Sequence, residues 1–322
     1  MLAIATSFQA FKTPQVQSTA ARCWFSSSSY LRRSDLTVDG ERLWNNIHHT
    51  AQWSAPSPGG LTRFCADDND KKVRDWFRDE ALSIGAKYEV NSVGAQFATL
   101  PGKDNSIPPI AMCSHLDSVL TGGKFDGSNQ RSYVLGALEV LRSFKEQGNQ
   151  THAPVTVINW TNEGGARFVP SLGASSVWAE DHTVDEIHAS VTHAGDSLTM
   201  GDELRRIGYI GDAPSTCSQY PLSVHFELHN GQNTELEEAG KFAGWAVGYQ
   251  AVAGYEILLD GEDGHAATYA MPKRRDALVG ASKIIAAAHK AARGLGALRQ
   301  QPLSRPVRSA SATSNQPPEL LS

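Results

Sequence analysis

Three short apolar runs restrict the fold of this chain most, because each ends in polar residues that can bind a metal or move a proton. The runs PPIAMCSHLDS, VTVINWTNEGG and PLSVHFELHNGQ occupy positions 108–118, 155–165 and 221–232. Between the first two, Val134, Leu138, Leu141 and Phe144 recur at helical spacing, and Gly148 follows them. A strand, a helix and a second strand in this order predict a parallel crossover unit, and therefore an α/β fold.

The three runs also predict one shared site, because sites in open parallel sheets gather at the carboxyl ends of strands. The first run ends in His115 and Asp117, the second in Glu163 and the third in His229. His115 and Asp117 face the same side of an extended strand, so the carboxylate can hold the imidazole and fix its tautomer. Asp126 follows a Gly-Gly turn that would return its carboxylate towards His115. The alternative is a structural hydrogen bond to a buried histidine, beside a turn aspartate.

Composition excludes several other classes of protein. The formal net charge is −5, which argues against a nucleic-acid surface. No apolar run is long enough to cross a bilayer. The four cysteines are scattered without a CxxC pair, which favours neither a disulfide framework nor a structural zinc site.

The two ends of the chain differ in composition from its centre. Positions 1–34 contain no Asp or Glu but carry Lys12, three arginines and a serine run, which is typical of a mitochondrial transit peptide. We therefore separate 1–35 from the rest; the alternative is an extension without an address on a cytoplasmic protein. Positions 296–322 are rich in Pro, Ser, Gln and Arg and predict a disordered tail.

Other segments predict regular elements. Acidic residues at 67–70 precede an amphipathic stretch that Gly85 ends, which indicates a helix. Two short strands with glycines between and after them follow at 88–103. Near the end of the ordered part, 254–271 resembles a strand with a polar tail, and 274–293 predicts an alanine-rich helix that Gly294 ends. His225 is interpreted as having no partner at a spacing suited to a ligand role.

Four motifs in order connect the chain to a known family: SHLDSVLTGGKFDG, NWTNEGGARF, FELHNGQNTELEEAGK and GEDGHAATYAMPKRRDAL. Together they resemble the dinuclear metallo-amidohydrolases that include β-ureidopropionase, N-carbamoyl-L-amino-acid hydrolase and allantoate amidohydrolase, relatives of aminoacylase and of carboxypeptidase-like exopeptidases. The resemblance implies a hydrolase of linear amide or ureide C–N bonds. It also implies a mostly parallel-sheet catalytic domain over 36–252 and an α+β lid over 253–295, through which two copies form a homodimer.

The resemblance also implies roles for individual residues. His115 and His229 would bind metal ions, and Asp126 would bridge two of them, usually zinc or manganese. Glu163 would take a proton from metal-bound water, and Asp117 would orient His115. Bound metal lowers the pKa of water to about 7, and a carboxylate can pass the proton to the leaving nitrogen.

Two further residues would act on the substrate. Gln232 lies where the family has a glutamine beside the substrate. His265, on the lid, would reach the site of the partner subunit and stabilise the oxyanion.

The chain departs from the family pattern at several positions. The family motif NEEGARF has two adjacent glutamates, which on extended backbone would face the water and a metal, but the second is Gly164 here. Gly231 replaces another carboxylate, and a short insertion follows Asp126. The last metal histidine and the substrate-binding arginine and asparagine of the family have no counterpart. We therefore expect one metal ion or none. The alternatives are a catalytically impaired relative that acts as a binding or oligomerising subunit, and a truncated gene product.

Overall fold

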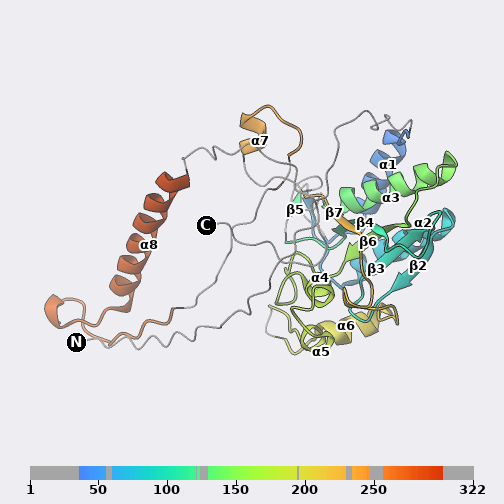
Figure 1. Ribbon diagram of the computed structural model, residues 1–322. Helices are drawn as coiled ribbons and strands as arrows, with labels where there is room; N and C mark the ends of the chain where they lie inside the picture. The colour runs from blue at the N-terminus through green and yellow to red at the C-terminus, as the bar shows by residue number, and fades with distance from the viewer. Residues whose placement is uncertain are drawn as a thin grey trace, which may run out of the picture. The chain divides into compact units, whose positions relative to one another are not determined.

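The computed structural model describes residues 36–55, 60–120, 122–123, 130–193, 196–229, 234–244, 246 and 257–299 (Figure 1). The predicted transit segment and most of the predicted tail lie outside these residues, and so do Asp126, Gly231 and Gln232. The chain divides into two compact units, with the boundary between Gly240 and Lys241. Each unit is described by itself.

A five-stranded sheet forms the centre of the first unit, in the order β2-β3-β6-β4-β7. The strands are β2 (Lys87–Val90), β3 (Gln96–Leu100), β4 (Ile110–His115), β6 (Val155–Trp160) and β7 (Val224–Glu227). Strands β6, β4 and β7 are parallel, as the three apolar runs predict. Strands β2 and β3 form a hairpin, and β3 pairs antiparallel with β6. The described sheet is therefore mixed rather than mostly parallel, because the turn between β2 and β3 is too short for a crossover.

Helices cover both faces of this sheet (Figure 1). One face packs against α1 (Gly40–Ala51), α2 (Asp68–Ser83) and α3 (Gln130–Glu146), in a core that includes Phe77 and Val157. The other face packs against α4 (Gly173–Trp178), α5 (Val184–His188) and α6 (Met200–Ile207), around Trp160 and Phe97. The fold of the first unit is therefore an α/β sandwich of three layers.

The helix boundaries follow the local signals in the sequence. The side chain of Asp67 accepts a hydrogen bond from the backbone N–H of Asp70 and caps α2. Gly85 and Gly148 follow α2 and α3 with positive φ angles of 74° and 67°. The predicted helices at 67–85 and 134–148 are thus confirmed, and so are the two short strands predicted at 88–103, which are β2 and β3.

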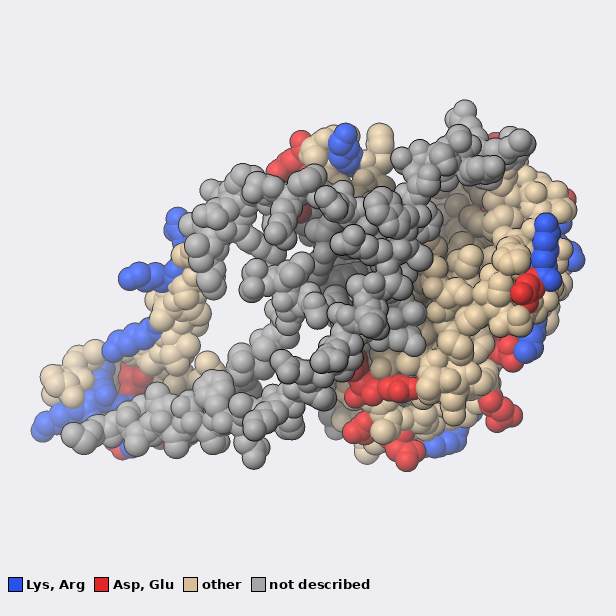
Figure 2. Space-filling view, in the orientation of Figure 1, with Lys and Arg blue, Asp and Glu red and all other residues tan. Residues whose placement is uncertain are grey.

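Small elements complete the first unit. Strands β1 (Gly60–Leu61) and β5 (Gly122–Gly123) pair with each other, and α7 (Glu235–Glu238) follows β7 in the chain. None of the helices within the described ranges combines the length and hydropathy that a bilayer span requires. Figure 2 shows acidic and basic side chains interspersed along the described surface of the first unit on this face.

The second unit differs from its prediction in two places. Residues 257–260 are exposed, irregular chain instead of a strand, because no strand lies beside them within the described part of this unit. After the 3-10 turn at Met271–Lys273, helix α8 (Ala277–Arg299) continues past Gly294, which keeps no left-handed backbone there. The predicted helix end at Gly294 and the disordered start at 296 are therefore wrong.

Candidate functional site

The imidazole of His115 is buried at the carboxyl end of β4. Its Nδ1 lies 2.9 Å from the carbonyl oxygen of Asp117 and 3.5 Å from the carboxylate oxygen Oδ1 of the same residue. The Nδ1–H therefore donates to the backbone carbonyl first. The sequence predicts Asp117 as the residue that orients His115, and the structure places it there, but through its carbonyl more than through its carboxylate.

The other imidazole nitrogen faces the carboxylate of Glu163. His115 Nε2 lies 2.9 Å from Glu163 Oε2, yet this approach lacks hydrogen-bond geometry, so Nε2 is a buried polar atom without a hydrogen-bond partner. Oδ1 of Asp117 is buried without one as well. Buried polar atoms are nearly always satisfied, which makes these two atoms candidates for contact with a ligand or an ion.

Neighbouring charges shift the pKa values of His115 and Asp117. Burial lowers the pKa of His115, but the carboxylates of Asp117 and Glu163 outweigh it and raise the pKa to about 10. Burial raises the pKa of Asp117, but the positive charges of His115 and Arg74 outweigh it and lower the pKa. The two pKa shifts have opposite directions, so each favours the charged form of its group in the pair His115 and Asp117.

Glu163 lies in a tight turn after β6, not on extended backbone. Asn162 has a left-handed φ of 56°, and its side-chain Nδ2 donates to the carbonyls of Phe168 and Pro170. Gly165 has a φ of 63°, and a Cβ there would lie 2.5 Å from the Cβ of Ser171. The expectation that positions 163 and 164 alternate between two faces is therefore wrong, because the turn sets the direction of both side chains.

Gly164 has room for a side chain. A Cβ at this position would lie 3.6 Å from Val119 Cγ1 and 3.7 Å from Asp117 Oδ2, which are ordinary van der Waals distances. Its φ is not in the left-handed region, unlike that of Gly165. The backbone does not require glycine at 164. The local fold would therefore accept a carboxylate side chain at this position.

A second polar group lies on β7 and just after it. His229 Nε2 lies 3.1 Å from Glu227 Oε1, and His225 Nε2 lies 3.4 Å from Glu227 Oε2. The ring centroids of His115 and His229 are 6.4 Å apart. The structure therefore brings His115, Asp117, Glu163 and His229 together, as the sequence predicts.

Glu227 is the residue that the sequence reasoning misses. Burial raises its pKa, but His229, His225 and His115 outweigh this and lower it. Its signal was present, because residues 225, 227 and 229 alternate and share one side of an extended strand. The interpretation of His225 as lacking a partner is wrong for the same reason.

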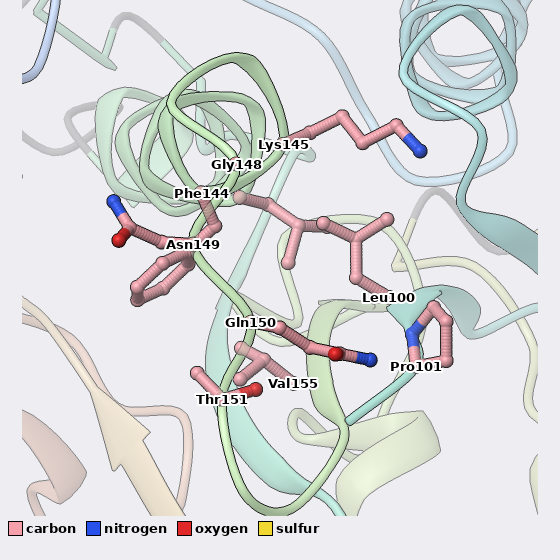
Figure 3. Close-up of a pocket in the computed structure, with 10 residues that line it drawn as sticks. Leu100, Pro101, Phe144, Lys145, Gly148, Asn149, Gln150, Thr151 and Val155 are labelled. Carbon is pink, nitrogen blue, oxygen red and sulfur yellow. The ribbon is translucent and has the colours of Figure 1, made fainter. Parts of the chain in front are cut away.

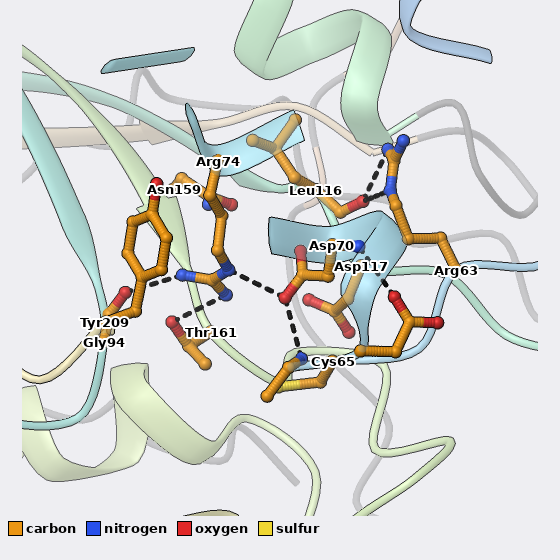
Figure 4. Close-up of polar contacts among 12 residues, drawn as sticks. Arg63, Cys65, Asp70, Arg74, Gly94, Leu116, Asp117, Asn159, Thr161 and Tyr209 are labelled. Carbon is orange, nitrogen blue, oxygen red and sulfur yellow. Dashed lines mark hydrogen bonds and ion pairs between the residues drawn. The ribbon is translucent and has the colours of Figure 1, made fainter. Parts of the chain in front are cut away.

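Two buried arginines lie beneath the strand ends (Figure 4). Arg74 Nε lies 2.7 Å from Asp70 Oδ2, and its two other nitrogens donate to the Gly94 carbonyl and to the hydroxyl of Thr161, just before the Glu163 turn. Arg63 donates two hydrogen bonds to the carbonyl of Leu116, between His115 and Asp117. The polar side chains of the site thus rest on a buried hydrogen-bonded frame.

The remaining predicted residues are not part of this group as described. Asp126 and Gln232 lie outside the described residues. His265 belongs to the second unit, where it is exposed and its Nδ1 accepts hydrogen bonds from the backbone N–H groups of Ala267 and Thr268. Over the described ranges, no group of three or more His, Cys, Asp or Glu is arranged to hold a metal ion.

A separate pocket lies at the opposite end of the strands. It has a volume of about 260 Å³ and is lined by residues that include Leu100, Phe144, Lys145 and Val155 (Figure 3). Val155 begins β6, whereas Glu163 follows the end of that strand. The pocket is therefore not part of the His115 site.

The mixed α/β sheet, with a histidine and carboxylates at the ends of its parallel strands, fits the fold of solved amidases. A solved amidase of the hydantoinase/carbamoylase family from Burkholderia vietnamiensis aligns with a TM-score of 0.66 and 35% identity, over 80% of this chain and 60% of that protein. The chain is thus similar to hydantoinase/carbamoylase amidases over about three fifths of their length. No family model matches it.

Curated relatives agree with this assignment. An N-carbamoyl-L-amino-acid amidohydrolase from Rhizobium meliloti is 35% identical over 248 residues, which are 77% of this chain and 58% of the relative. A ureidoglycolate hydrolase from Arabidopsis thaliana is 29% identical over 263 residues, which are 80% of this chain and 54% of the relative. The chain therefore spans little more than half the length of these curated relatives.

Proposed function

We propose that the chain is a metal-dependent hydrolase of C–N bonds in linear amides and ureides, with N-carbamoyl amino acids as its substrate class. The observation that carries the proposal is the buried Nε2 of His115, which lies 2.9 Å from the Glu163 carboxylate without a hydrogen bond. The names of the relatives, which include N-carbamoyl-L-amino-acid amidohydrolases, support the substrate class.

The donor atoms present suit a divalent cation. Imidazole nitrogens and carboxylate oxygens are the ligands that zinc and manganese take in proteins. His115 and His229 would hold the ion together with Asp126. When bound, such an ion would polarise the substrate carbonyl and lower the pKa of a coordinated water to about 7.

Residues of the chain would orient the two histidines and transfer the proton. The Asp117 carbonyl accepts a hydrogen bond from the Nδ1–H of His115, so that Nε2 faces Glu163. Oε2 of Glu163 lies beside Nε2 of His115, where it can accept a proton from water and return it to the leaving nitrogen. Glu227 holds the ring of His229 next to that of His115.

The lid and the dimer are finer parts of the same proposal. We infer that 253–295 is part of a lid through which two copies pair, and that His265 serves the site of the partner. Support comes from α8, where Leu278 and Ile285 are 79% and 68% exposed and would be covered in a dimer.

A second candidate function is binding without turnover, by a catalytically impaired relative. The observation that favours it is Gly164, which leaves out a carboxylate at a position where the backbone has room for one. In this case the chain would bind the substrate class or an intact partner, but would release no ammonium.

Ammonium release from N-carbamoyl-L-amino acids and N-carbamoyl-β-alanine tests the proposal, in protein loaded with zinc or manganese. We expect turnover that Glu163→Gln reduces by roughly 10²- to 10⁴-fold, since the base is lost while the amide keeps the shape. Glu89→Gln on β2 is the matched control and should leave turnover unchanged. Metal-loaded chain that binds the substrate but releases no ammonium supports the second candidate instead.

A further inference from the structure

The side chain of Arg63 is one of the largest buried polar groups in the first unit, and all its nitrogens are used. Nε and Nη2 donate to the carbonyl of Leu116 at 3.0 and 2.8 Å. Nη1 donates to the carbonyls of Thr50 and Trp53 at 3.1 and 3.3 Å. The guanidinium therefore connects the end of α1 with Leu116, the residue between His115 and Asp117. Figure 4 shows the two bonds to Leu116.

The backbone of Arg63 holds the same segment from its other side. The Arg63 N–H donates to Ser118 Oγ at 2.9 Å, and the Ser118 N–H donates to the Arg63 carbonyl at 2.7 Å. Leu116 and Ser118 are thus both fixed by one residue, and Asp117 lies between them.

Burying the charged side chain of Arg63 costs free energy that a purely structural role would not require. Arg63 makes no ion pair within the described residues, and burial lowers its pKa to about 10 against the opposing charges of Asp70, Asp67 and Asp117. An apolar side chain of similar volume would avoid the desolvation of a charge. A guanidinium, however, supplies several hydrogen-bond donors in one fixed plane. Two of those of Arg63 donate to the Leu116 carbonyl.

We propose that Arg63 is a positioning residue of the site: it fixes the Leu116–Ser118 segment so that the Asp117 carbonyl accepts the Nδ1–H of His115 and turns Nε2 towards Glu163. The inference rests on the proposed function for its catalytic meaning. The positioning itself is a property of the metal-free chain and is tested there.

The test follows the imidazole Nδ1–H of His115 by NMR in the full-length, metal-free chain labelled with ¹⁵N-histidine. This proton is present whether Nε2 is protonated or not, so the readout does not depend on the charge of the ring. In the native chain we expect slow exchange with solvent, because the group is buried and hydrogen-bonded. Arg63→Lys, which keeps the charge but not the planar fork, should accelerate exchange at least roughly tenfold, and Arg63→Met should accelerate it further.

Ile187→Ala in α5 is the control for lost stability alone. Ile187 is fully buried in the core on the other side of the first unit, and its truncation is expected to cost about 2–5 kcal/mol. The His115 Nδ1–H should exchange as in the native chain under conditions where this variant stays folded. If Arg63→Met does not fold, the comparison of Arg63→Lys with Ile187→Ala decides.

Three outcomes would overturn the proposal: fast exchange of the proton in the native chain, native exchange in Arg63→Lys, or equal acceleration in Ile187→Ala. Failure of the proposed function gives a different pattern. The native chain would then release no ammonium and bind no metal, while the effect of Arg63→Lys on the Nδ1–H would persist.

Discussion

The ends of β4 and β6 differ from the end of β7, although all three carry histidines or carboxylates of the same site. His115 and Asp117 have side chains that are 2% exposed and rest on buried arginines. On β7, the edge of the described sheet, the side chains of Glu227 and His229 are 23% and 33% exposed. The first region is preorganised and cannot relax into water, whereas the second is partly solvated. A lost partner should therefore cost much more in the first region than in the second.

The largest expected effect is on the buried frame. Arg74→Met leaves Asp70 with an unpaired charge in a fully buried position, and we expect a loss of about 3–5 kcal/mol in the free energy of unfolding. Urea unfolding measures it. The double variant Asp70→Leu with Arg74→Met should cost less than the single one, because it removes the stranded charge. A single variant that loses less than about 1 kcal/mol would contradict the claim that this region cannot relax.

The next largest effect is expected when a carboxylate is introduced at position 164. Gly164→Glu places a carboxylate beside Asp117, which should destabilise the metal-free chain by like-charge repulsion and tighten zinc binding by roughly tenfold or more. Isothermal titration with zinc and the melting temperature with and without the ion measure both. Gly164→Gln, which has the same length without the charge, is the matched control. Equal zinc affinity in both variants would show that position 164 does not face the ion.

A smaller effect is expected on β7. Glu227→Gln should weaken zinc binding by about tenfold, because the ring of His229 loses its charged partner. Its free energy of unfolding should change by less than about 1 kcal/mol, because the group is partly solvated. Glu89→Gln again serves as control in the same titration. A loss of stability as large as that of Arg74→Met would remove the distinction between the two regions.

The sequence predicts the parts of this site that depend on periodicity. The apolar runs that become β4, β6 and β7 could be recognised, and so could the crossover helix α3. For β4 and β6 the reason is burial on both faces of the sheet, which leaves a continuous apolar pattern. Strand β7 lies at the edge of the described sheet and is more exposed. The convergence of His115, Glu163 and His229 follows from that topology.

Other features depend on tertiary contacts that leave no local signal. A single arginine in a loop, such as Arg63, gives no sign that it is buried or which carbonyls it holds. The turn at Glu163 depends on the left-handed Asn162 and its bonds to carbonyls six and eight residues later. The role of the Asp117 carbonyl was also hidden, because sequence patterns describe side chains and not backbone groups. Glu227 is different, since its alternation with two histidines was readable.

An anomalous difference map from crystals of the metal-free chain soaked in zinc tests the central claim most directly. The account predicts a peak at coordination distance from Nε2 of His115, about 2.0–2.1 Å, on the side that faces Glu163. A peak bound elsewhere, or no peak beside His115 in crystals that contain zinc at other positions, would contradict it.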